Sequence, residues 1–174
     1  MKQPVLILSI CFLAVLLFSI PAPAIMLGMS TEDLTKSSQT VIIGEVGDVV
    51  CQWSEDGKRI VTRATVEVDE VVKGNRNHSE IIVEYEGGEI GEIGLKVSDS
   101  PSLVSGENVI LFLKEIGEAR GASINNIVGK AQGKYSIGED GIVRKTGFEL
   151  LKGNNVIDNA ISVDEIVGKI KAIK

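Results

Sequence analysis

The chain holds one histidine, and its surroundings decide whether acid–base or metal chemistry is open to it. His78 lies in the polar run from Asn75 to Ser79, where we expect an exposed loop. A zinc site needs three or four ligands, and a serine hydrolase needs a hydroxyl, an imidazole and an acid held in line. The nucleophile-elbow pattern G-x-S-x-G does not occur. We therefore assign no catalytic, metal-binding or cofactor-binding residue from the sequence.

Three glycines at a spacing of three, Gly88, Gly91 and Gly94, faintly resemble a phosphate-binding loop. The Gly-Lys-Ser/Thr ending of such loops is missing, and no helix is expected after them. Glycines in this pattern also suit a bent β connection, which is the interpretation we favour.

Paired acids are the remaining candidates for chemistry, and they occur at Glu55-Asp56, Glu89/Glu92 and Glu139-Asp140. The first and third pairs precede a glycine in expected hairpin turns, which accounts for them without a function. Hydrolysis by a carboxylate pair would require a cleft and a shifted pKa, which a sequence does not reveal. A cell-envelope hydrolase that uses Glu89 or Glu92 therefore stays as the alternative function.

Cys51 and Trp53 share the parity of Val49 on an expected strand, which predicts a buried thiol and a core tryptophan. Cys51 is the only cysteine after residue 24, so the exported chain cannot form an internal disulfide. A dimer-forming or reactive thiol, and a Trp53 on an exposed rim beside the turn, are the alternatives.

The first 24 residues have the pattern of a cleavable secretory signal. Lys2 precedes an apolar run from Val5 to Ile20, and Ala22 and Ala24 give the small-x-small site that signal peptidase reads. The run is short of the roughly 20 residues that a membrane anchor needs, so an uncleaved anchor is the minor alternative. We expect a secreted or periplasmic protein with one domain at 25–174 and no stable membrane insertion.

The charge excludes one class of partner. Loss of Lys2 with the signal changes the formal charge from −6 to −7, and the chain has no basic stripe with interleaved aromatic residues. Nucleic acid is therefore not expected as a partner.

The elements that must position any site are mostly strands. We expect a short helix at 30–38 capped by Ser30 or Thr31, strands near 41–53, 60–69, 81–85, 109–113, 128–137 and 142–144, and loops at 73–77, 98–105 and 117–121. Lost alternation at 70–72 predicts a bulge or a strand end. Ser162 and Glu165 predict a capped helix over 162–173. The sequence thus predicts a mainly β, antiparallel barrel or sandwich with a helix near each end.

Four segments resemble a family of small exported bacterial proteins of unknown role: Thr40 to Val46, Val66 to Gly74, Gly106 to Leu113, and Gly129 to Tyr135. The first three, in this order, are also similar to the netrin-like domain of tissue inhibitors of metalloproteinases. The similarity to the exported bacterial family covers roughly Ser30 to Val143 and the last helix, and the netrin-like resemblance of the three segments implies an OB-like barrel. It departs at the predicted mature start, Ile25-Met26-Leu27, where those inhibitors carry the zinc-chelating Cys-x-Cys.

The leading hypothesis is a non-enzymatic exported binding module, because the pattern is barrel-like and lacks a catalytic constellation. Its partner would be another exported protein, and a protease is suggested by analogy alone. OB-like barrels bind through one sheet face and adjoining loops. We therefore expect the connections at 87–94 and 99–106 to contact the partner, through Gly88, Glu89, Gly91, Glu92, Ser100 and Ser102. A structural role in envelope assembly is a third possibility.

Overall fold

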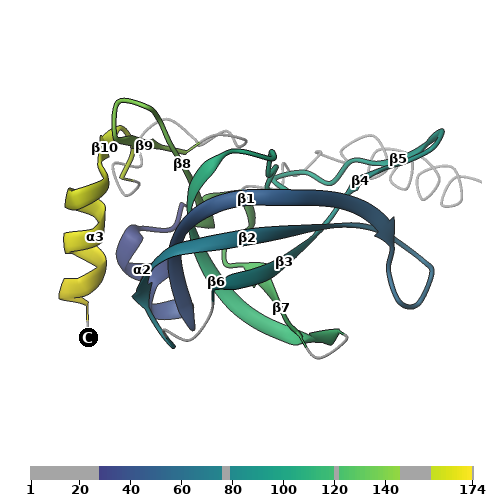
Figure 1. The fold of residues 1–174 in the computed structure, drawn as a ribbon, viewed down its shortest axis with the longest axis horizontal. Coiled ribbons are helices and arrows are strands. Elements are labelled where there is room, and N and C mark those ends of the chain that lie inside the picture. The colour runs from purple at the N-terminus through teal and green to yellow at the C-terminus, as the bar shows by residue number, and fades with distance from the viewer. Residues whose placement is uncertain (1–27, 76–78, 120–121, 146–157, 174) are drawn as a thin grey trace, which may run out of the picture.

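The computed structural model describes residues 28–75, 79–119, 122–145 and 158–173. It is mainly β, with helix α2 (Thr31–Ser37) and helix α3 (Val163–Ala172) near the two ends (Figure 1). The strands are β1 (Thr40–Trp53), β2 (Ile60–Lys73), β3 (Glu80–Glu86), β4 (Gly88–Ile90), β5 (Ile93–Leu95), β6 (Asn108–Ala119), β7 (Ala122–Ile127), β8 (Lys134–Ile137), β9 (Ile142–Arg144) and β10 (Ile161–Ser162). A 3₁₀ turn, η1 (Lys130–Gly133), separates β7 from β8.

Five strands close in a ring in the order β1, β2, β3, β7, β6 and back to β1. Neighbours run antiparallel except β3 and β7, which pair in parallel at Ile82 with Ile124 and Val83 with Asn125. The sequence predicted a purely antiparallel assembly, and this is wrong at that junction. Strand directions cannot alternate around a ring with an odd number of members, so five strands require at least one parallel pair.

Strand β1 bends enough to pair with both β2 and β6. Its register with β2 shifts at three places, including one between Val46 and Val49, and such bulges increase the local bend and twist. The lost alternation at 70–72 lies at the other two of these three shifts, so it marks bulges and not the strand end, because β2 continues to Lys73. The β1–β2 turn and the long alternating strand after it are confirmed.

The core has two parts, and β6 contributes to both. Val109, Leu111 and Leu113 face the interior of the ring, whereas Ile110 and Phe112 face a second cluster under the two helices. All five side chains are fully buried. The prediction of a central strand that is apolar on both faces is therefore confirmed.

The segment after β6 differs from the expectation. The predicted strand at 128–137 is interrupted, because Gly129 adopts a left-handed φ of 69° and η1 follows it. Gly133 packs so closely that a Cβ atom would lie 2.1 Å from the Val128 carbonyl oxygen. Only 134–137 of the predicted stretch is strand, as β8. Strand β7, which precedes it, was not predicted. The expected loop at 117–121 is wrong for 117–119, which belong to β6, and 120–121 lie outside the described residues.

The glycine-rich connection at 87–94 forms a separate two-stranded hairpin from β4 and β5. Figure 1 shows it extending beside the far end of β1 and β2. The expected loop at 98–105 follows it, and the Asp140-Gly141 turn joins β8 to β9 as predicted.

Both helices begin with a serine cap. Ser30 Oγ accepts a hydrogen bond from the Asp33 N–H, and Asp33 reciprocates in a capping box. Ser162 Oγ accepts from the Glu165 N–H, and Ile166 and Ile170 are the buried residues of α3. Within the described ranges, no helix combines the length and apolar character that a membrane crossing requires.

Candidate functional site

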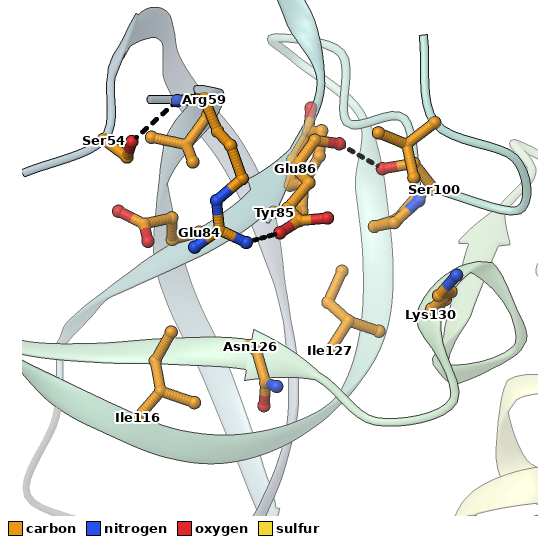
Figure 2. A pocket seen from close by; sticks show the side chains of 13 residues that line it. Ser54, Arg59, Glu84, Tyr85, Glu86, Ser100, Ile116, Asn126, Ile127 and Lys130 are labelled. Atoms are coloured by element: carbon orange, nitrogen blue, oxygen red, sulfur yellow. Dashed lines mark hydrogen bonds and ion pairs between the residues drawn. The ribbon is translucent and has the colours of Figure 1, made fainter. Parts of the chain in front are cut away.

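Two adjoining cavities are lined by residues of β3 and by residues of β6 and β7 across from it. Their volumes are about 340 Å³ and 300 Å³, and both are lined by Ser54, Arg59, Glu84 and Ile116. We call the combined space the β3 groove. One wall comes from the β1–β2 turn, the floor from β2 and β3, and the opposite wall from β6 and β7 (Figure 2).

The β1–β2 turn is linked by hydrogen bonds from its own side chains. Asp56 Oδ1 accepts hydrogen bonds from Ser54 Oγ at 2.6 Å and from the Lys58 N–H at 3.2 Å. Ser54 Oγ in turn accepts from the Arg59 N–H at 3.0 Å. These bonds, led by that of Ser54, lower the pKa of Asp56. The turn therefore presents the Arg59 side chain from a fixed position at the groove wall.

Two arginine–glutamate pairs form the charged floor. Arg63 Nε donates to Glu84 Oε2 at 2.7 Å, between residues that lie directly opposite each other on β2 and β3. Their side chains are 24% and 20% exposed. Arg59, which precedes β2 in the turn, pairs with Glu86 of β3, as Figure 2 shows, and these two side chains are 57% and 47% exposed. Cross-strand pairs of this kind fix the side chains and leave further carboxylate lone pairs free to accept hydrogen bonds.

The groove is acidic overall and partly apolar. Three basic and five acidic side chains line the two cavities, which gives a formal charge of −2. Ile116 is 52% exposed and faces the floor from β6, near Asn126 and Ile127 of β7 (Figure 2). Eight of the lining residues are charged, so the groove is more polar than a typical small-molecule pocket, which is mostly apolar. The tyrosine of the lining, Tyr85, packs partly buried against the ring interior.

The Asn126 side chain destabilises the wall of the groove locally, because one of its polar atoms is buried without a partner in the described part of the chain. Among the described residues, its Oδ1 and the Lys145 Nζ are the buried side-chain atoms without a hydrogen-bond partner. An unpaired buried polar atom costs about 1–3 kcal/mol. Departures from the best local solution of this kind are typical of surfaces shaped for a function.

The groove contains only part of the site expected from the sequence. Ser100 lines it, and its Oγ donates to the Glu86 carbonyl oxygen at 2.6 Å. Ser102 is exposed, and its carbonyl accepts from the buried Lys134 ammonium. Gly88, Glu89, Gly91 and Glu92 lie in the β4–β5 hairpin and line neither cavity.

We did not predict four residues of the groove from the sequence: Arg59, Glu84, Glu86 and Ile116. The alternation of β2 places Arg63 on the outer face of the sheet, and the alternation of β3 places Glu84 on the same face. These two patterns together could have predicted the Arg63–Glu84 ion pair. Ile116 could not be placed, because the chain from 114 to 119 was not recognised as strand.

The sequence also predicted the burial of Trp53 and Cys51 and an exposed loop position for His78. Trp53 is 47% exposed, so core packing is wrong and the exposed rim is correct, because β1 extends past the end of the ring interior. Cys51 is half-buried, with Sγ 3.4 Å from Thr62 Oγ1, which is less than the predicted burial. His78 lies outside the described residues.

Within the described part of the chain, no group of three or more His, Cys, Asp or Glu side chains could hold a metal ion. Glu89 and Glu92, the carboxylates of the alternative hydrolase, are both exposed on the hairpin.

Comparison with known proteins finds no matching family model and no matching curated sequence.

Proposed function

We propose that this chain is an exported, non-enzymatic module that binds another protein in the β3 groove. The observation that carries the proposal is the groove itself, two adjoining cavities with a hydrogen-bonded, arginine-bearing turn on one side and the exposed Ile116 on the other. Export rests on the signal pattern of the first 24 residues. The acidic lining argues for a protein partner and against nucleic acid.

We further infer that the ring is OB-like. Strands β6, β1, β2 and β3 follow the Greek-key order 4-1-2-3, and β7 closes the ring as a fifth strand. OB-folds are five-stranded Greek-key barrels that bind over strands 2 and 3, between the loops after strands 1 and 4. The β3 groove has the corresponding place, between the β1–β2 turn and the β6–β7 hairpin. This reading agrees with the netrin-like resemblance, by which a protease is one class of partner.

Loss of partner capture tests the proposal. Ile116→Asp places a charge on the exposed wall of the groove, and it should reduce recovery of the partner from the exported fraction at least tenfold. Val104→Asp is the matched control, because Val104 is 61% exposed and lines neither cavity. Capture that survives Ile116→Asp, or that both variants lose equally, would refute the groove as the binding surface.

A further inference from the structure

The parallel strands β3 and β7 part soon after they meet. Their pairing covers only Ile82 and Val83 on β3, although β3 continues to Glu86 and β7 to Ile127. On its other edge, β3 stays paired with β2 through Glu86. The last three residues of β3 therefore have a registered neighbour on one side and the larger cavity on the other (Figure 2).

The free edge carries backbone hydrogen-bonding groups. The Ile82 carbonyl accepts from Asn125 Nδ2 of β7 at 3.4 Å, and the Glu86 carbonyl accepts from the Ser100 hydroxyl at 2.6 Å. Alternate residues of a strand direct their backbone groups to the same edge, so Glu84 also faces the gap. A serine side chain thus occupies the place of a strand partner at one end. Between its parallel pairing with β7 and the Ser100 contact, the edge has no registered strand partner among the described residues, and an edge without a partner strand is a template for an added strand.

The charges define which segment would fit. In a strand added beside β3, residues opposite Glu84 and Glu86 would lie on the same outer face as these two carboxylates. Arg63 and Arg59 each contact one oxygen of these carboxylates, so basic residues two positions apart would meet the second oxygen of each acid, in a groove whose lining still carries a net charge of −2. The residue between them would face inward, beside Tyr85 and Ile127, where an apolar side chain fits.

We propose that an extended partner segment with a basic–apolar–basic pattern adds as a short strand to the edge of β3 at Glu84–Glu86. This inference rests on the proposed function and specifies its partner, because main-chain hydrogen bonds would give affinity and the alternate side chains specificity. Three residues span about 10 Å in a strand, which matches the length of the free edge.

Three peptides test the proposal by amide chemical-shift mapping on the full exported chain. They are acetyl-Thr-Lys-Val-Lys-Thr-amide, its backbone N-methylated form, and the version with glutamate in place of both lysines. The lysine peptide should shift the amides of Glu84, Tyr85, Glu86 and Ile127. The N-methylated and glutamate peptides should bind at least tenfold more weakly.

Two variants on the same strand complete the test. Glu86→Gln should weaken the lysine peptide about threefold, the effect of one exposed ion pair. Glu80→Gln should not, because Glu80 lies at the other end of β3 and lines neither groove cavity. Equal binding of the N-methylated peptide, shifts outside the β3 edge, or no binding up to about 1 mM would overturn strand addition. None of these results would alter the effect of Ile116→Asp on capture, so the two proposals fail separately.

Discussion

Lys145 places a basic side chain in a buried environment, which disfavours its charged form. Its side chain is buried, and its Nζ lies 4.4 Å from the centre of the Tyr135 ring without a hydrogen-bond partner. Burial lowers the pKa of the Lys145 ammonium to about 7, against a smaller opposing effect of Asp158. Burial also raises the pKa of the Tyr135 phenol. The two groups therefore make stability depend on pH in different ranges.

Lys145→Met should change how stability depends on pH. Between pH 7 and 9 the unfolded lysine is protonated and the folded one is mostly neutral, so the unfolded state binds more protons. Stability of the natural chain should therefore rise with pH in this range, by at most about 1.4 kcal/mol per unit. The tyrosine has no effect there, because its unfolded form ionises near pH 10.

Denaturant unfolding at pH 7, 8 and 9 measures this effect. The Lys145→Met variant should be more stable at pH 7, and its advantage should shrink as the pH rises. Lys171→Met, at an exposed position on α3, serves as the control. A constant difference between the natural chain and Lys145→Met across the three pH values would show that Lys145 is charged in the fold.

Asn126→Leu should stabilise the isolated protein. The replacement removes the unpaired Oδ1 and keeps a similar shape, so we expect a gain of about 1 kcal/mol in the free energy of unfolding. Thermal unfolding would detect the rise in Tm. A loss of stability would mean that the Asn126 amide makes a favourable interaction that the leucine removes.

Burial of single residues could be predicted from the sequence where it depends only on which face of the strand a residue occupies. The inward positions of β2, from Ile60 to Val66, are buried as their alternation predicts. Parity failed for Trp53, because a residue on the inner face is buried only where the ring continues above it. The sequence does not show where the interior of a curved sheet ends.

At the scale of elements, local patterns predicted most strands and both helices. The β1–β2 hairpin, β3, the buried part of β6 and the capped helices all carry strong short-range signals. Strand β7 does not, because Ser123, Asn125 and Asn126 make it polar, and the ring supplies its pairing through β6. Because β7 was not predicted, the groove wall that it forms was not predicted either.

Gly88 explains the path of the β4–β5 hairpin and provides a test of it. Its φ is 126°, and a Cβ atom there would lie 2.6 Å from Cys51 Sγ and 2.7 Å from Thr62 Oγ1. Gly88→Ala should therefore destabilise the protein by more than about 2 kcal/mol, through backbone strain and steric overlap together.

Gly91→Ala is the matched control in the same hairpin. Gly91 has a φ of 60° but no atom within 4 Å of a built Cβ, so only backbone strain of about 1 kcal/mol applies. Denaturant unfolding of both variants compares the two costs. Equal destabilisation would contradict the close approach of Gly88 to Cys51.

At the scale of the whole molecule, pairing between distant strands creates the groove. The ring joins β1 to β6 and β3 to β7, and neither contact has a signature in the local sequence. The mainly β class could be predicted because alternation is a local property. The parallel junction, and the cavity that opens beyond it, depend on how the ring closes.

The two ends of the ring carry different elements. The helices and the second core cluster lie at one end of the ring, and the β1–β2 turn with the β4–β5 hairpin lies at the other (Figure 1). We therefore expect substitutions on α3 to affect stability and leave partner binding unchanged.

Site-specific photocrosslinking tests the central claim most directly. A photoreactive side chain in place of Glu55, which is 82% exposed at the groove, should form an adduct with one partner protein in the exported fraction. The same group in place of Ala172, exposed on α3, should form none. Adducts from Ala172 alone, or the same adduct from both positions, would contradict binding in the β3 groove.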